Sequence, residues 1–279
     1  MTTDRLLLLI DAHVHLYDCY DLPIFLESAL KNCRAQTDTL RHNGPILGIL
    51  LLTEISCDHW FQRLRAFAEE NRTLTHHSGK TWSFHRTEEE VTILANSSQG
   101  ERILFVAGRQ MATREKFEVL ALITKESFQD GMSLHESIDR VKKSGGIPVI
   151  PWAFGKWWGA RGKLLNEFMQ SSAMTNVYVG DNGSRPGFLP YPPQFTLACE
   201  QGIRILPGSD PLPIHSESSK PCSVGLSLFA ELDEQKPGAT LKRLLQEANT
   251  PISPYFQHES CYRFFKNQVA LRMQKSRAT

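Results

Sequence analysis

Two histidines separated by one residue, His13 and His15, have the type and spacing best suited to chemistry in this sequence. They follow an unbroken apolar run over residues 6–10, in an Asp-x-His-x-His pattern that begins at Asp11. Side chains alternate along an extended chain, so both imidazoles would lie on one side and could bind one divalent cation. An accidental or merely hydrogen-bonded pair is the alternative. The apolar strand before the pair and the acidic residues after it favour the metal site.

Other polar residues follow apolar runs of the kind that form buried strands. Six of them are candidates for a shared site: Glu54, Gln110, Glu118, Asp181, Asn182 and Asp210. Ligands bind at the carboxyl ends of strands in barrels and open parallel sheets, where these residues would gather. We expect Asp210 and Glu54 to join the two histidines as metal ligands and to be the catalytic residues. Two histidines with carboxylates suit Zn, Mn or Fe, as one or two ions.

A cation held in this way predicts metal-assisted hydrolysis. It would lower the pKa of a bound water and hold a phosphoryl or carbonyl oxygen, and Asp210 could take the proton of that water. Both carboxylates have a second interpretation. Glu54 could cap the following helix, and Asp210, in Gly-Ser-Asp-Pro, could form a turn or a helix N-cap.

A loop rich in glycine and tryptophan over residues 152–163 could hold an anionic substrate. Its glycines let a backbone approach a ligand, its tryptophans offer apolar walls, and its cations offer charge. The candidate substrate-binding residues here and in neighbouring motifs are Lys156, Arg161, Arg185, Asn182 and Arg109. The alternative is a loop anchored by its tryptophans with the cations in water.

Composition is that of an ordinary globular protein, with 279 residues, 41% hydrophobic and 22% charged. A net charge of +1 gives no reason to expect nucleic acid as the main partner. The cations of the loop over residues 152–163 predict a small anionic substrate instead. No run approaches the roughly 18–20 apolar residues of a membrane span, so no membrane partner is expected. The six cysteines lack any Cys-x-x-Cys spacing, which predicts reduced thiols in the cytoplasm. The sequence does not indicate the oligomeric state.

Alternating strand and helix patterns predict an α/β protein with a parallel sheet or barrel. The first four elements are expected at 6–10, 24–40, 46–52 and 57–70. Residues 72–125 instead look like four short strands, which we interpret as a small mixed β excursion on one flank of a single domain spanning residues 1–279. Later strands are expected at 147–151, 176–179 and 203–206, and later helices at 134–143, 163–172, 193–201, 224–232, 239–248 and 259–274.

The order of these motifs resembles the PHP family, the polymerase and histidinol phosphatase domain of amidohydrolase-like enzymes. The matching segments are residues 11–15, 52–54, 106–110, 118–122, 145–152, 176–179 and 208–212. The resemblance spans nearly the whole chain, and its first and last motifs are the specific ones. It implies a distorted (β/α)7 TIM-like barrel that holds a cluster of two or three metal ions and hydrolyses phosphoesters.

Several family ligand positions carry other residues in this chain: Ile55, Gln110, Glu118, Trp152 and Leu212. Glu118 could replace a histidine as an oxygen ligand. We therefore expect a reduced site in a metal-dependent hydrolase acting on a phosphoester or another small anionic substrate. Two alternatives stay open: a catalytically inactive PHP-like barrel that binds a ligand or a protein, and an amidohydrolase acting on a C–N or C–C bond.

Overall fold

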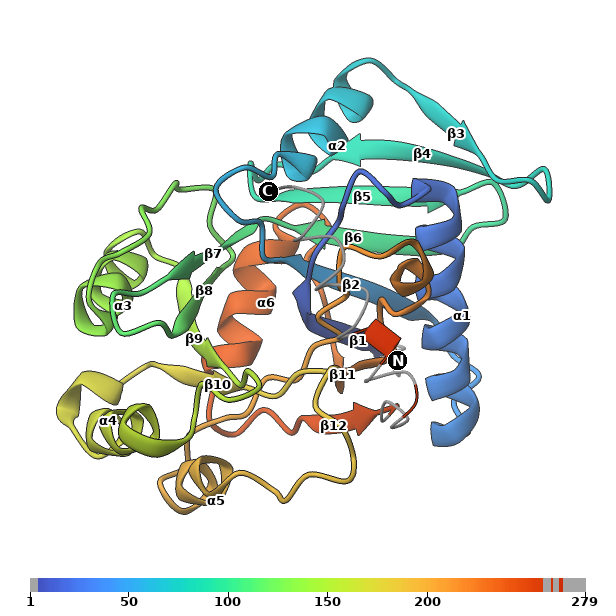
Figure 1. Cartoon of the computed structure of the whole chain (residues 1–279). Coiled ribbons are helices and arrows are strands. Elements are labelled where there is room, and N and C mark those ends of the chain that lie inside the picture. Colours follow the sequence, from blue (N-terminus) through green and yellow to red (C-terminus); the bar gives the residue numbers. More distant parts are fainter. Residues whose placement is uncertain (1–4, 258–261, 263–265, 268–279) are drawn as a thin grey trace.

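The computed structural model describes residues 5–257, 262, 266 and 267, and Figure 1 shows their arrangement. These residues form twelve strands: β1 (Leu6–Val14), β2 (Ile46–Leu52), β3 (Thr73–Thr75), β4 (Thr81–Arg86), β5 (Thr92–Ser97), β6 (Arg102–Val106), β7 (Gly108–Ala112), β8 (Glu118–Leu122), β9 (Ile147–Pro151), β10 (Tyr178–Gly180), β11 (Val224–Ala230) and β12 (Ser253–Phe256). The helices are α1 (Leu22–Leu40), α2 (Trp60–Glu69), α3 (Leu134–Lys143), α4 (Gly159–Met169), α5 (Pro193–Glu200) and α6 (Pro237–Gln246), with short 3-10 turns η1 (Ser172–Met174) and η2 (His215–Ser219).

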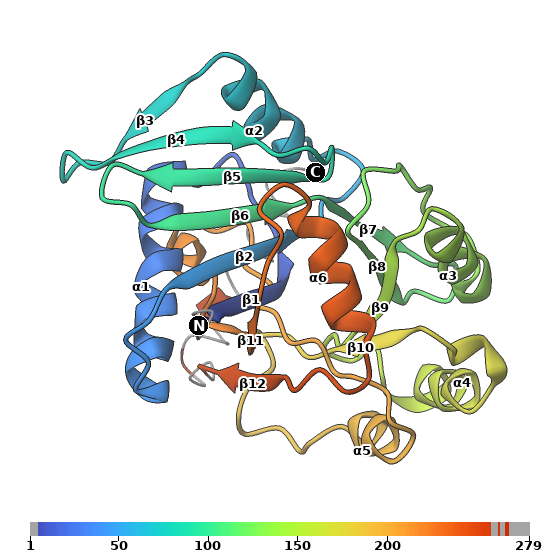
Figure 2. The ribbon, with the colours of Figure 1, turned by 180° about the vertical axis from the view of Figure 1, so that it is seen from behind.

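The strands form two sheets. The larger has eight strands in the order β12-β11-β1-β2-β6-β5-β4-β3, and the smaller has four in the order β10-β9-β8-β7. In the large sheet β1, β2 and β6 are parallel, while β11, β12, β5, β4 and β3 are added through antiparallel pairs. Figures 1 and 2 show the large sheet from its two sides.

Apolar side chains cover both faces of β1, which explains its unbroken apolar sequence. Leu7 and Leu9 pack into a core shared with α1 and α2. Leu8 and Ile10 pack on the opposite face into a core shared with α6 and the small sheet. A third core lies between the small sheet and the helices α3, α4 and α5. The buried, central position predicted for this strand is confirmed.

The expected distorted (β/α)7 barrel is wrong. In the described part of the chain the strands lie in two open sheets. The strand β1 has a parallel neighbour on one side only, because β11 pairs with it in the antiparallel sense. Antiparallel pairs also join β7 to β8 and β8 to β9, whereas a (β/α) barrel is built from parallel strands.

The predicted β excursion over residues 72–125 is also placed wrongly. Its strands exist, but β3, β4, β5 and β6 extend the large sheet, while β7 and β8 belong to the small one. Further along the chain, the predicted helix over 224–232 is the strand β11, and the predicted strand over 203–206 forms only an isolated bridge between Ile205 and Val179. The helix predicted over 259–274 falls almost entirely outside the described residues.

The two sheets approach each other at two places. A parallel bridge joins Glu54, just after β2, to Arg109 in β7. Near the other edge, Asn182 bridges Gly208, and the amide of Ala12 in β1 donates to the carbonyl of Pro207 at 3.1 Å. The carboxyl end of β1 is thereby brought together with residues 182 and 207–210. Among the described residues, no helix is long and apolar enough to cross a membrane.

Candidate metal centre

A bulge at the carboxyl end of β1 aims the two histidines. Asp11 pairs with Leu50 and Val14 with Leu52, so three steps along β1 match two along β2. Such an insertion turns the following side chains relative to the regular strand. His13 and His15 then share one side, as their spacing predicted, and both are buried, at 3% and 4% exposure.

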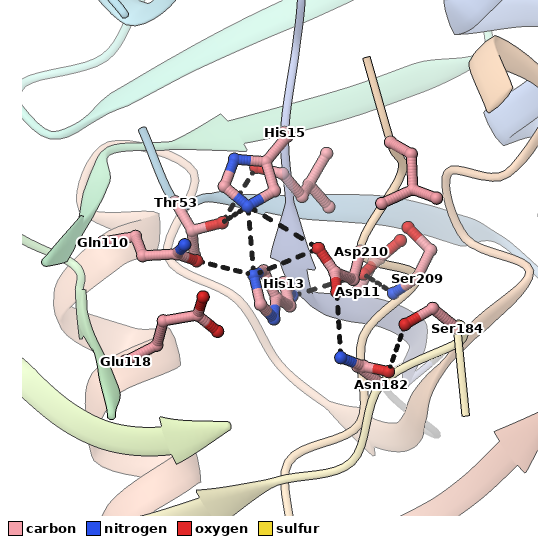
Figure 3. A network of polar contacts seen from close by, with 12 residues as sticks. Asp11, His13, His15, Thr53, Gln110, Glu118, Asn182, Ser184, Ser209 and Asp210 are labelled. Atoms are coloured by element: carbon pink, nitrogen blue, oxygen red, sulfur yellow. Dashed lines mark hydrogen bonds and ion pairs between the residues drawn. The ribbon is translucent and has the colours of Figure 1, made fainter. Parts of the chain in front are cut away.

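Three ligand atoms converge at this end of β1 (Figure 3). The Nε2 atoms of His13 and His15 lie 3.1 Å apart. Oδ1 of Asp210 lies 3.5 Å from Nε2 of His13 and 3.7 Å from Nε2 of His15. These residues form a group that could hold a metal ion, which agrees with the prediction for all three.

Backbone contacts place Asp210 beside the histidines. Its amide donates to the carbonyl of His13 at 2.8 Å, and its backbone has a φ of +45°. Non-glycine residues seldom adopt positive φ, although aspartate tolerates it better than most, and such conformations gather at functional sites. The segment crosses β1 so closely at Gly208 that a Cβ there would lie 2.2 Å from the amide nitrogen of His13. Only glycine fits at that crossing.

Asp11 holds the backbone around the site through hydrogen bonds. Its carboxylate accepts hydrogen bonds from the amides of His13 (3.3 Å), Ser209 (2.8 Å) and Cys222 (2.8 Å). Burial raises the pKa of Asp11 to about 7, against the opposing effect of these hydrogen bonds. The first acid of the Asp-x-His-x-His pattern therefore ties β1 to the segment that carries Asp210.

Burial sets the protonation of the ligands. It lowers the pKa of both His13 and His15 to about 4, so at neutral pH both imidazoles are uncharged and can offer a lone pair. Burial also raises the pKa of Asp210 to about 6, and the carboxylate is mainly ionised above that pH. All three groups are thus in the protonation state that a cation requires.

The spacing fits a single first-row cation. Tetrahedral zinc, with ligand distances of about 2.0–2.1 Å, places neighbouring ligand atoms about 3.3 Å apart, close to the 3.1, 3.5 and 3.7 Å found here. One feature departs from common metal sites. Both Nδ1 atoms are buried without a hydrogen-bond partner among the described residues, whereas ligating histidines usually donate that proton to an acceptor. We therefore expect weaker binding than in a fully supported site.

Gln110 is a fourth polar group at the cluster. Its Oε1 lies 3.0 Å from Nε2 of His13, and Thr53 Oγ1 lies 3.5 Å from Nε2 of His15 (Figure 3). An amide oxygen is a hard, neutral ligand that can complete a site of two histidines and one carboxylate. The sequence analysis named Gln110 among the six candidates for the shared site but not among the expected metal ligands, and its position in the third motif was the available signal.

Glu54 and Glu118 have other partners. Glu54 accepts a hydrogen bond from the amide of Phe61 at 2.6 Å, in the first turn of α2, and pairs with Arg109 at 3.0 Å. Burial raises the pKa of Glu54, which these two contacts oppose. Glu118 lies beside the cluster in Figure 3 but pairs with Lys156 at 2.6 Å. Neither carboxylate belongs to the converging group, and their roles as ligands stay predictions.

The predicted substrate-binding cations are mostly engaged within the protein. Arg185 makes two hydrogen bonds to the buried Asp181, at 2.8 and 2.7 Å. Arg161 donates to the carbonyl of Gly155 at 2.8 Å, and Arg109 donates to that of Asp58 at 2.9 Å. The side chain of Lys156 keeps 30% exposure beside Glu118, and thus stays within reach of a ligand.

Asn182, predicted to bind substrate, is hydrogen-bonded to a residue of the cluster. Its Nδ2 donates to Asp210 Oδ2 at 2.9 Å and to the carbonyl of Trp152 at 2.8 Å, while Ser184 Oγ donates to its Oδ1 at 2.8 Å. The amide holds the Asp210 carboxylate with its other oxygen facing the histidines.

Comparison with known proteins gives a fold but no family. No family model and no curated protein matches the sequence. Among solved structures, PsfC from Pseudomonas syringae PB-5123 matches with a TM-score of 0.50 and 10% identity, over 99% of this chain and 100% of that one. The lesion-specific endonuclease PfuEndoQ from Pyrococcus furiosus matches with a TM-score of 0.50 and 10% identity, over 89% of this chain and 57% of that one. At this identity the likeness shows the fold alone.

The second of these proteins corrects one expectation. The sequence predicted a small anionic substrate and no nucleic-acid partner, and the exclusion of nucleic acid rested on the net charge of +1. PfuEndoQ has a related fold and is an endonuclease, an enzyme that acts on nucleic acid, so the exclusion of nucleic acid is wrong. Net charge is a total over the whole surface, and it does not describe the cations and aromatic rings at one site.

Proposed function

We propose that this protein is a metal-dependent hydrolase that cleaves a phosphodiester bond in nucleic acid, using one divalent cation held by His13, His15 and Asp210. The convergence of two buried imidazole nitrogens and one carboxylate oxygen within 3.7 Å of one another carries the proposal. The amide oxygen of Gln110 is the proposed fourth ligand. The fold shared with an endonuclease supports the choice of nucleic acid.

A cation at this site would supply Lewis acidity to a phosphoryl oxygen and lower the pKa of a water. The protein's own groups divide the remaining work. Asn182 fixes the Asp210 carboxylate through Oδ2, and Asp210 is the group proposed to accept the proton of the attacking water. Lys156 can exchange its contact with Glu118 for a phosphate oxygen and so hold the substrate.

Metal content and hydrolysis test the proposal together. The chain is purified without chelator, its metals are counted by mass spectrometry, and bis-p-nitrophenyl phosphate and a labelled oligonucleotide are assayed with added Zn or Mn. We expect about one ion per chain. His13→Ala/His15→Ala should lose the ion and lower the rate by more than about 100-fold. The control is His77→Ala, which changes an exposed histidine in a loop and should alter neither. Less than about 0.1 ion per chain, unrestored by added metal, would rule out the metal site.

A binding module without catalysis is the second candidate. The ion pair between Lys156 and Glu118, 2.6 Å apart, favours it. This pair engages both the lysine proposed to hold the substrate and the glutamate predicted as a further metal ligand. A bound cation with no turnover of either substrate, under conditions where His13→Ala loses the cation, would identify this function.

A further inference from the structure

Four aromatic side chains in two loops are exposed beside the candidate site. Phe154 and Trp158 lie in the loop after β9 and are 51% and 50% exposed. Phe188 and Tyr191 lie in the loop after β10 and are 51% and 54% exposed. We call these four residues the aromatic surface. Burying such rings would stabilise a folded protein, so their exposure points to a ligand that covers them.

Both loops begin at the metal cluster. The carbonyl of Trp152, at the start of the first loop, accepts a hydrogen bond from Asn182 at 2.8 Å. Asn182 starts the second loop and also holds Asp210 at 2.9 Å. Because β9 and β10 are parallel neighbours, their carboxyl ends lie at the same end of the small sheet, and both loops start there. The first residues of both loops are therefore hydrogen-bonded to the proposed site of hydrolysis.

Buried contacts join the first loop to α5, the helix that follows the second loop. Trp157 and Phe195 pack edge to face with centroids 5.1 Å apart, and Gln194 Nε2 donates to the carbonyl of Trp157 at 3.4 Å. Trp158 directly follows one of these residues along the chain, and Phe154 packs edge to face on it at 5.1 Å. The exposed pair Phe154 and Trp158 therefore lies next to the packed contact between Trp157 and Phe195.

Tyr191, in the second pair, lies beside a buried arginine. The guanidinium of Arg185, fixed by Asp181, lies 5.6 Å from the ring centroid of Tyr191. Prolines at 186, 190, 192 and 193 restrict the backbone of this loop. Rings held in this way lose little conformational freedom when a flat partner stacks on them.

The charge around the aromatic surface is modest. The loop after β9 and the start of α4 offer Lys156, Arg161 and Lys163, and the whole chain has a net charge of +1. Proteins that bind single strands combine cations along the phosphates with aromatic rings on which unpaired bases stack. Three cations in the same segment as Phe154 and Trp158 fit this combination.

We infer that the aromatic surface binds single-stranded nucleic acid by stacking at least two unpaired bases on Trp158 and Tyr191, next to the cluster. The inference rests on the proposed function for its substrate class. It adds that bases, rather than phosphates alone, are recognised, and that a strand must be unpaired where it meets these loops.

Binding is measured by the anisotropy of a fluorescein-labelled dT15 in EDTA, so that no cleavage occurs. Trp158→Ala/Tyr191→Ala should weaken binding by more than about ten-fold, because each stacked base is lost. Trp158→Phe should retain most of it. A blunt hairpin duplex should bind more weakly than dT15, and three phosphate contacts give a slope of log K against log salt of about −2. Stacking on Trp158 should also quench tryptophan fluorescence in the wild type, and this quenching should be lost in Trp158→Ala.

The matched control is Phe229→Ala, which removes another exposed ring, 47% accessible, from β11. Phe229 pairs with Leu7, about 20 Å along β1 from His13. Equal dT15 affinity in the double variant and in Phe229→Ala would overturn the inference. So would a dimer in sedimentation that becomes monomeric in the double variant without any oligonucleotide binding, because the rings would then cover a second copy.

The same samples separate this inference from the proposed function. His13→Ala should keep wild-type affinity for dT15 while losing hydrolysis. If the wild type binds dT15 through these rings but hydrolyses nothing, the proposed function fails and the binding surface stands. If the wild type hydrolyses bis-p-nitrophenyl phosphate but Trp158→Ala/Tyr191→Ala binds dT15 with wild-type affinity, the inference about the aromatic surface is wrong and the proposed function stands.

Discussion

The side-chain amide of Asn182 lies 2.9 Å from Oδ2 of Asp210. The loop that carries Asn182 therefore fixes the Asp210 carboxylate, which lies in another loop and faces the two histidines. Asp210 therefore presents Oδ1 in a defined direction without help from a second cation. This contact makes Asn182 a positioning residue for the site, and its removal is the most direct test of how the site is held together.

Asn182→Ala should weaken Zn binding by about 10- to 100-fold, the usual loss when the group that orients a metal ligand is removed. Competition with a chromogenic chelator measures this affinity. Asn249→Ala, at an exposed asparagine near the end of α6, should leave it unchanged. An unaltered affinity in Asn182→Ala would mean that Asp210 needs no support.

Gln110→Glu should tighten cation binding by about ten-fold or more, equal to ~1.4 kcal/mol, because a second carboxylate neutralises a dication better than an amide does. Gln110→Ala should weaken it, since Oε1 lies 3.0 Å from His13 Nε2. Isothermal titration of the metal-stripped chain measures both variants. Gln99→Glu adds the same charge at an exposed turn and is the control. Equal affinities in all three variants would remove Gln110 from the site.

Glu54→Gln should lower the free energy of unfolding by ~2–4 kcal/mol, because it leaves the mostly buried Arg109 without its counter-ion. It should not change cation affinity, since Glu54 faces Phe61 and Arg109. Urea unfolding and metal titration give the two values. Glu69→Gln, in a half-exposed pair with Arg86, should cost little stability. A loss of cation binding in Glu54→Gln would restore this residue as a ligand.

The ion pair of Glu101 with Lys80 should make the free energy of unfolding depend on pH in the acidic range. Burial alone would raise the pKa of Glu101, but hydrogen bonds from Ser97 and Lys80 outweigh it and lower the pKa. Because the folded-state pKa lies below the unfolded value of about 4.3, the carboxylate stabilises the fold above that pH. This contribution is lost as pH falls through the lower, folded-state pKa.

Urea unfolding of wild type and Glu101→Gln across the acidic range measures this contribution. Their difference in unfolding free energy should be constant near neutral pH and shrink as the solution becomes more acidic. Glu234→Gln, at a carboxylate 71% exposed opposite Arg102, should show a small difference at every pH. A gap for Glu101→Gln that widens in acid would reverse the assigned direction.

Local rules predicted the parts of the site that depend on neighbouring residues. The alternation of side chains placed His13 and His15 on one side, and the apolar run before them predicted a strand buried on both faces. The bulge between Asp11 and Val14 was not predictable, because it depends on how β1 pairs with β2.

Contacts between distant segments determine the features that the sequence did not predict. Residues 224–230 have apolar side chains compatible with a helix, yet they lie as a strand between β1 and β12. The partners of the predicted substrate cations were equally hidden. Lys156 meets Glu118, 38 residues away in sequence, and only the folded chain shows that this cation already has a counter-ion.

The anchoring of Asp11 has a consequence for how the protein acquires its cation. The carboxylate holds the amide of Ser209 across 198 residues of sequence and that of Cys222 across 211. Contacts of such long separation form late in folding, because loop closure must precede them. A nascent chain in which β1 has left the ribosome but residues 207–222 have not therefore has the two imidazoles and Gln110 but lacks the Asp210 carboxylate. We expect ribosome-bound fragments ending before residue 207 to bind Zn weakly, so that metal loading follows the completion of synthesis and reports on native folding.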